Sequence, residues 1–147
     1  MKRPARTFVI AEIGENHLGD WDIARRMISA AAAAGADAVK FQSYLGGEVA
    51  PDDPEREWFT KVQVPDEVHH KLKKFAKDKG VQFMSAPFSL GRAKLLCEGL
   101  GLRQIKVASS EMLNYKLLDY LDLRCKTVYL STGMATIEEI RKALGHL

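Results

Sequence analysis

Two lysines, Lys40 and Lys106, are the residues of this sequence best placed for chemistry, because each lies at the end of a short run typical of a strand. If their ammonium groups lie close together, they repel each other unless an anion or a carboxylate sits between them. Separate salt bridges, with Glu12 and Glu111 as partners, would satisfy this condition. A shared cradle for a phosphate or carboxylate ligand would satisfy it too, and composition alone leaves both arrangements open. Three serine hydroxyls could help such a cradle: Ser85, Ser109 and Ser131.

These residues lie in an alternation of apolar and amphipathic segments that repeats five times along the chain. The pattern predicts strands over residues 7–12, 36–42, 81–86, 103–107 and 127–131. Helical periodicity predicts helices over residues 22–34, 65–80, 89–98 and 115–121, and from residue 136 onward. Because each helix returns the chain to begin the next strand, repeated strand–helix units imply a parallel sheet.

Local signals mark the ends of several helices. Pro65 is suited to the first turn of the second helix, and Gly80 ends that helix. Ser89 is a candidate N-cap for the third helix. Thr136 and Glu139 have the spacing of a capping box, in which each residue binds a free backbone N–H of the other.

The polar residues at the strand ends favour one of two parallel architectures. No glycine-rich phosphate loop follows any predicted strand, which weakens an open doubly wound sheet that binds nucleotides. Side-chain alternation places Lys40 and Gln42 on one face of the second strand, and Lys106 with Gln104 on one face of the fourth. One polar face that converges at the strand ends is typical of a (β/α)8 TIM barrel. Five units supply five of its eight strands, so we expect either a truncated chain or a partner that completes the sheet.

Charge argues against nucleic acid as a partner. The net charge is +3, from 22 Lys and Arg against 19 Asp and Glu, and no basic patch is evident. The lysine-rich segment 71–79 has helical spacing and is predicted to be a solvated helix face. His69 and His70 are adjacent on the same helix, and we expect both at the surface.

Membrane association is not expected either. The longest apolar stretch, around residues 30–34, is too short to cross a bilayer, and the segment that starts at Met1 shows no signal peptide. Cys97 and Cys125 lack the spacing of a metal site or of a redox CxxC motif, and Cys97 is expected in the core. These features predict a cytoplasmic protein.

Five segments together resemble the sialic acid synthase family, in the family's order and at its strand ends. The segments are IAEIGENHLG at 10–19, GADAVKFQ at 35–42, SAPFS at 85–89, KVASSE at 106–111 and LSTGM at 130–134. The resemblance extends from about residue 8 to about residue 144. It implies a (β/α)8 barrel that condenses phosphoenolpyruvate with N-acetylmannosamine or a related acyl-amino sugar aldehyde.

The resemblance also implies roles for individual residues. Lys40 and Lys106, with the serine hydroxyls, would hold the phosphate and carboxylate of phosphoenolpyruvate, while Gln42 and Glu111 would contact the sugar. Glu12 would lie near a divalent ion, Mn2+ or Mg2+, through a bound water. That ion would polarise the sugar aldehyde as a Lewis acid, and the fixed cations would stabilise the phosphate as charge moves.

Further implications concern the whole family enzyme. Its two metal-binding histidines come from later strands, and a C-terminal antifreeze-like domain reaches into the site of a partner in a homodimer. We therefore expect residues 1–147 to form the first five units of the barrel domain, to lack the main metal ligands, and to be inactive alone. The sequence departs from the family at Ser110, where glycine is more frequent, and at Ala86, where a threonine hydroxyl often contacts phosphate.

Several alternatives stay open on sequence grounds. A lysine at a strand end could form an imine, as in a Schiff-base aldolase. The chain could instead be a non-catalytic half-barrel. Glu12 could simply neutralise Lys40. Asn16 and His17 fit either a turn after the first strand or a substrate contact.

Overall fold

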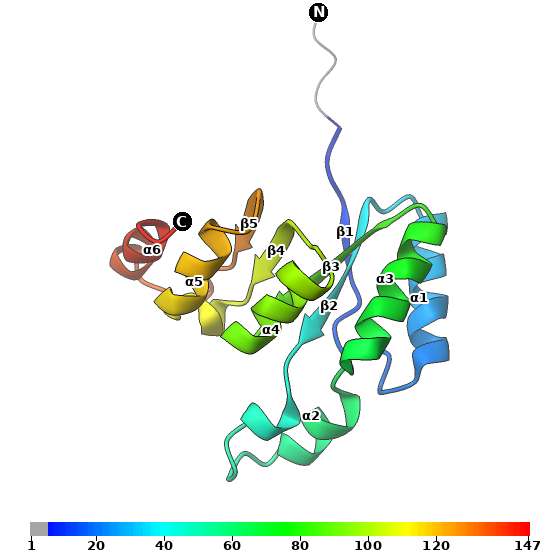
Figure 1. Cartoon of the computed structure of the whole chain (residues 1–147), viewed down its shortest axis with the longest axis horizontal. Helices are drawn as coiled ribbons and strands as arrows, with labels where there is room; N and C mark the ends of the chain where they lie inside the picture. The colour runs from blue at the N-terminus through cyan, green and yellow to red at the C-terminus, as the bar shows by residue number, and fades with distance from the viewer. Residues whose placement is uncertain (1–5) are drawn as a thin grey trace, which may run out of the picture.

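The computed structural model describes residues 6–147, and the residues before Arg6, on which the signal-peptide expectation partly rests, lie outside this range. Five parallel strands run through the molecule (Figure 1). Strands β1, β2 and β3 pair in this order, and β4 pairs with β5. Strands β3 and β4 lie side by side, so the strands follow one another in chain order. Their bounds are Ile10–Glu12, Ala38–Ser43, Gln82–Pro87, Gln104–Val107 and Thr127–Leu130.

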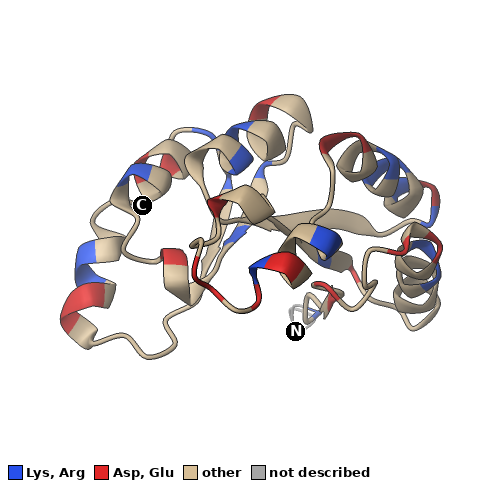
Figure 2. Ribbon diagram, turned by 90° about the horizontal axis from the view of Figure 1, so that it is seen from below, with Lys and Arg blue, Asp and Glu red and all other residues tan. Residues whose placement is uncertain are grey.

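Helices connect the strands and form an arc around one side of the sheet (Figure 2). Six α-helices are described: α1 Trp21–Ala33, α2 Arg56–Val62, α3 Asp66–Asp78, α4 Leu90–Lys94, α5 Tyr115–Asp122 and α6 Ile137–Leu144. Three short turns of helix complete the chain: η1 Gly46–Glu48, the π-helix η2 Leu95–Gly99 and η3 Ser109–Glu111. The parallel α/β architecture expected from the sequence is confirmed.

Side chains at the helix N-termini explain where several helices begin. The Ser89 hydroxyl accepts a hydrogen bond from the Arg92 N–H and so caps α4. At α6, Thr136 and Glu139 form the predicted capping box, in which each side chain accepts from the other residue's N–H. These bonds satisfy backbone donors that have no partner within the helix. The short amphipathic sequences therefore start as helices at defined residues.

The two faces of the sheet differ as the side-chain alternation predicts. Val39, Phe41 and Phe83 point toward the helices and are almost fully buried, and the Phe41 and Phe83 rings stack with centroids 5.4 Å apart. The helices complete this core with apolar residues such as Ile28 and Leu72, which are 0% and 1% exposed. Burial of this layer fixes which face of each strand points away from the helices.

The connection between β2 and α3 contains structure that the sequence pattern does not indicate. No helix or strand was predicted between residues 42 and 65, but this connection folds into η1 and α2, which lie beyond the C-terminal end of β2 (Figure 1). Gly46 makes this possible, because a Cβ at this position would lie 2.5 Å from the Thr60 Cα in α2. Only glycine allows the two backbones to approach so closely.

The adjacent histidines of α3 differ in burial. His70 is exposed as predicted, but His69 is fully buried, so its predicted surface position is wrong. It lies on the face of α3 that packs on the sheet, edge-on to the Phe83 ring. Cys97 is buried as expected, and its sulfur lies 3.8 Å from that of Cys125, a contact that the sequence separation does not reveal.

Within residues 6–147, no helix combines the length and apolar character needed to span a membrane.

Candidate active site

Glu12 is the last residue of β1, and Lys40 lies beside it in the middle of β2. The two residues are in register in the parallel ladder, so their side chains leave the sheet on the same face. Lys40 forms an ion pair with Glu12, and the lysine side chain is 12% exposed against 51% for the carboxylate. One of the two expected salt bridges is therefore present, and Glu12 neutralises Lys40 in this state.

Lys106, at the end of β4, is held differently. Its Nζ donates to the Val107 carbonyl oxygen at 2.7 Å and to the Ser131 hydroxyl. Within residues 6–147, Lys106 has no carboxylate partner, and Glu111 accepts a hydrogen bond from the Asn114 amide instead. The alternative of a Lys106–Glu111 salt bridge is therefore wrong.

The electrostatics indicate that Lys106 and Lys40 share one neighbourhood. Burial lowers the pKa of Lys106 below its ordinary value, the positive charge of Lys40 lowers that pKa further, and Glu12 partly opposes the effect. The positive charges of the two lysines therefore lie close enough to affect each other across the sheet. A doubly charged anion placed there would relieve the repulsion between them.

Two of the three predicted serines follow β4 and β5, and one of them contacts Lys106. Ser131 follows β5 directly, and its hydroxyl accepts from the lysine. Ser109 begins η3 after β4, and a Cβ built on Gly133 would lie 3.7 Å from the Ser109 hydroxyl oxygen. The loops that follow β4 and β5 therefore bring both hydroxyls to the same end of the sheet.

Ser85 does not join this group. It is in register with Phe41, which points toward the helices. Its side chain is fully buried, and its hydroxyl has no hydrogen-bond partner among the residues that the structure describes. The residue in register with Gln42 is Ala86, which carries no polar group. The expected contact between Ser85 and a ligand is not supported, because the alternation along β3 turns this hydroxyl to the other face.

A cavity of about 500 Å3 lies beyond the strand ends, beside the predicted sugar-binding residues. Both Gln42 and Glu111 line it, as do side chains of the segment that contains η1 and α2. Its wall is partly aromatic and partly acidic: Glu15, Gln42, Tyr44, Leu45, Glu48, Val49, Trp58, Phe59, Phe88 and Glu111. The fold thus brings Gln42 and Glu111 together, although they are distant in sequence.

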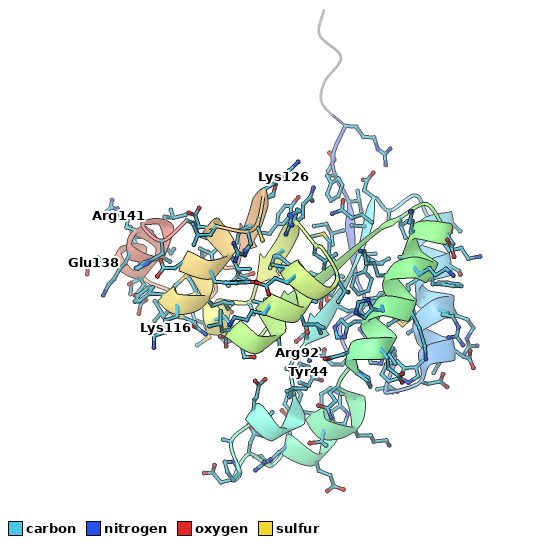
Figure 3. The ribbon with its side chains drawn as sticks, viewed as in Figure 1. Tyr44, Arg92, Lys116, Lys126, Glu138 and Arg141 are labelled. Atoms are coloured by element: carbon cyan, nitrogen blue, oxygen red, sulfur yellow. The ribbon has the colours of Figure 1, made fainter. Side chains whose placement is uncertain are left out.

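Three residues that the sequence did not single out organise this cavity. Glu15, in the loop after β1, accepts a hydrogen bond from Gln42 Nε2 at 3.0 Å. Asn114 donates to Glu111 Oε2 at 2.9 Å and caps α5. Tyr44 lies between the sheet and α2 (Figure 3), and its buried hydroxyl has no hydrogen-bond partner among residues 6–147. Alternation along β2 could have indicated Tyr44, but no spacing rule links Glu15 with Gln42.

Burial perturbs two of these groups. It raises the pKa of the Glu15 carboxyl above its ordinary value, and the Glu12 charge adds to this effect. Burial also raises the pKa of Tyr44, with a further contribution from Glu15. Tyr44 is therefore a neutral phenol at physiological pH, able to donate a hydrogen bond beside a partly desolvated carboxyl group.

A buried arginine holds the C-terminal end of β2 in place through hydrogen bonds. Arg92 of α4 donates from Nε to the Ser43 hydroxyl at 2.9 Å and from Nη1 to Asp66 at 2.6 Å. Figure 3 shows Arg92 and Tyr44 close together at the point where β2 gives way to η1. These bonds tie β2, α3 and α4 together, so the residues that follow Ser43 have a defined origin.

Asn16 and His17 have structural contacts in the loop after β1. The Asn16 amide donates to the Ile13 carbonyl oxygen, and His17 Nδ1 accepts from the Gly19 N–H. His17 is fully buried against Trp21 and Phe41. Of the two roles considered for these residues, these contacts support turn formation.

The residues described do not form a complete metal site. Within residues 6–147, no group of three or more His, Cys, Asp or Glu side chains could hold a metal ion. Glu12 offers one half-exposed carboxylate, which already pairs with Lys40. A single engaged carboxylate does not fit the ligand number that Mg2+ or Mn2+ requires.

Chemically, the arrangement combines an anion-binding corner with a larger cavity. Lys40, Lys106 and the Ser131 hydroxyl offer positive charge and donors, whereas the adjacent cavity offers acceptors and aromatic faces. Such a pair of subsites suits one small anionic ligand and one neutral polyhydroxy ligand side by side.

Comparisons with known proteins show relatives in sequence and in fold. The chain is 36% identical to an N,N'-diacetyllegionaminic acid synthase from Campylobacter jejuni, over 97% of this chain and 47% of that protein. A crystal structure of an N-acetylneuraminic acid (sialic acid) synthetase from Leptospira borgpetersenii superposes with a TM-score of 0.88 and 33% identity, over 95% of this chain and 49% of that one. A truncated 3-deoxy-D-arabino-heptulosonate 7-phosphate synthase from Thermotoga maritima, 15% identical over 95% of this chain and 46% of that one, shares the fold with a TM-score of 0.70.

These relatives confirm the resemblance expected from the five sequence segments. The chain spans about half the length of the curated relatives it matches. The sequence profile of the NeuB family matches residues 27–147, which is most of the chain. The chain therefore belongs to the NeuB family.

Proposed function

We propose that this chain binds phosphoenolpyruvate for condensation with an acyl-amino sugar aldehyde, N-acetylmannosamine or a relative, to give a nonulosonate and phosphate. The observation that carries the proposal is Lys106, a partly buried ammonium group without a carboxylate partner among residues 6–147, which donates to the Ser131 hydroxyl and feels the charge of a second lysine, Lys40. Membership in the NeuB family and the names of its relatives support the same reaction class.

The proposed chemistry places one reactant in each subsite. The enol carbon of phosphoenolpyruvate bonds to the aldehyde carbon of the sugar, and the aldehyde oxygen takes the electron pair and a proton. Water then adds to the cationic carbon that bears the phosphate, and phosphate leaves to give the keto acid. Lys40 and Lys106 would hold the phosphate and carboxylate throughout, so that little reorganisation accompanies the movement of charge. Gln42 and Glu111 would orient the sugar.

The proposal includes the rest of the expected enzyme. Five strands would form part of a (β/α)8 barrel whose active form is a cytoplasmic homodimer. Glu12 would contact Mn2+ or Mg2+ through water, with the other ligands supplied outside residues 6–147. Because those residues alone do not fit a metal site, the function proposed for this chain is the binding and orientation of the substrates.

Calorimetric titration with phosphoenolpyruvate tests this proposal. Lys106→Met removes a charge-assisted contact, and we expect it to weaken binding by about tenfold or more. Lys126→Met is the matched control, because Lys126 is an exposed lysine at the opposite end of β5 (Figure 3). The phosphoenolpyruvate affinity of this variant should stay within about twofold of wild type. Equal affinities for wild type and Lys106→Met would remove the anion-binding role.

A Schiff-base aldolase is the second candidate, because the lowered pKa of Lys106 also favours a nucleophilic amine. Borohydride reduction in the presence of pyruvate separates the two functions. An imine would leave a covalent adduct on Lys106, visible by mass spectrometry. We expect no adduct, because hydroxyls around the lysine suit anion binding.

A further inference from the structure

The cavity beside the lysines has a polar wall that is rich in hydrogen-bond acceptors. Carboxylates of Glu15, Glu48 and Glu111 line it, together with the Gln42 amide. Apolar faces of Trp58 and Phe88 complete its wall. A ligand that fits such a wall must supply hydrogen-bond donors, because an unpaired acceptor buried by the ligand costs free energy.

The orientation of the Gln42 amide is decided by its surroundings. Its Nε2 donates to Glu15 Oε2 at 3.0 Å. A Cβ built on Gly14 would lie 3.7 Å from this Nε2 and 3.4 Å from Glu12 Oε1, so the nitrogen faces the acidic loop after β1. The flipped amide would set its oxygen against a carboxylate, and two acceptors without a proton between them repel. Its oxygen therefore points away from Glu15.

A second observation indicates that the cavity is prepared for a polar ligand. Tyr44 lines it and is 6% exposed, yet its hydroxyl has no hydrogen-bond partner in the described part of the chain. Buried hydroxyls usually have a partner, and the neighbouring Glu15 carboxyl is already engaged by Gln42. An additional acceptor on the ligand would satisfy this donor.

From these contacts we infer that Glu15 is a positioning residue that turns the Gln42 oxygen toward the bound sugar and thereby selects a sugar with an acylamino N–H at that point. The inference rests on the proposed function, since it concerns the second substrate of the same reaction. An amide carries both groups that the wall calls for: its N–H donates to Gln42, and its carbonyl oxygen accepts from a donor such as Tyr44. Glu15 itself touches no reacting atom and acts through Gln42.

The test compares two sugars that differ in one hydrogen-bond donor. Calorimetry measures the binding of N-acetylmannosamine and of its N-methyl-N-acetyl counterpart, which lacks the N–H, to protein loaded with phosphoenolpyruvate. Wild type should prefer the N–H sugar by about tenfold or more. In Glu15→Gln, the new amide can donate or accept, so Gln42 is no longer held in one orientation, and the preference should fall to about threefold or less. Glu15→Leu removes the acceptor altogether and should have the same effect.

Controls separate the possible outcomes. Glu67→Gln removes one negative charge from the exposed surface of α3 and should keep the wild-type preference. Phosphoenolpyruvate affinity of the Glu15 variants should stay within about twofold of wild type, which also reports that they are folded. An unchanged sugar preference in both Glu15 variants, or no preference in wild type, would overturn the inference and leave the proposed function intact. No phosphoenolpyruvate binding by wild type would overturn the proposed function and the inference together.

Discussion

Acid should destabilise this protein through one buried histidine, His69. Its ring is fully buried between α3 and the sheet, where Nδ1 lies 3.1 Å from the Pro65 carbonyl oxygen and Nε2 has no partner from Arg6 onward. The pKa of His69 is lowered from 6.5 to about 4, mainly by burial and further by the nearby Arg92 charge, while the Pro65 carbonyl and Asp66 partly oppose this shift. A proton on Nε2 would have no acceptor there.

The size and direction of the effect follow from this pKa. Above pH 6.5 the histidine is neutral in both the folded and the unfolded chain, so its contribution to stability is fully present. As the pH falls below 6.5, the unfolded chain binds a proton that the folded chain does not, and the free energy of unfolding decreases until about pH 4. The total loss is about 3 kcal/mol, of which about 2 kcal/mol has occurred at pH 5.

Urea unfolding followed by tryptophan fluorescence at pH 8 and pH 5 measures this loss. Because other groups titrate in the same range, the informative quantity is the comparison with His69→Phe, which keeps a ring in the core and cannot be protonated. The variant should lose about 2 kcal/mol less than wild type between the two pH values. His70→Phe, at the exposed neighbouring position, should behave like wild type. Equal losses in wild type and His69→Phe would refute the reasoning.

Two further predictions concern the elements that shape the site. Gly46→Ala should lower the free energy of unfolding by about 1–3 kcal/mol, because the added Cβ would lie 2.5 Å from the backbone of α2. Gly47→Ala, where a Cβ meets no atom within 4 Å, is the control for the same urea titration, and similar losses in both variants would contradict this explanation. Thr136→Ala should cost about 1 kcal/mol in thermal or urea unfolding, because it removes the acceptor for the first turn of α6. A Thr136→Ser variant should recover most of this loss, and no difference between the Ala and Ser variants would exclude the cap as the cause.

Much of the scaffold could be predicted because it depends on local chemistry. The N-cap at Ser89 and the capping box at Thr136 are decided within a few residues, and both are present as expected. Alternation along β2 and β4 correctly placed Lys40 and Lys106 on the polar face, since buried neighbours such as Phe41 must point toward the helices. Motifs at the strand ends correctly indicated the family.

Contacts between distant segments were beyond such reasoning. The Glu15–Gln42 hydrogen bond joins residues on different elements, and neither residue type indicates which residue it will bond to. His69 and His70 look equivalent in the sequence, yet the rotation of α3 against the sheet buries one and exposes the other. Ser85 was expected among the ligand-binding hydroxyls, but its position in the alternation along β3 directs its side chain toward the helices.

The sequence by itself determined the alternation of strands and helices, the polar face of the strands and the pair of lysines at their ends, because these follow from periodicity and from side-chain type. Only the tertiary structure decided which carboxylate pairs with which cation, which hydroxyls reach Lys106, and that η1 and α2 fold into the wall of a cavity. The physical reason is that hydrogen bonds, ion pairs and desolvation act over a few ångströms. Those distances exist only after the helices have packed on the sheet.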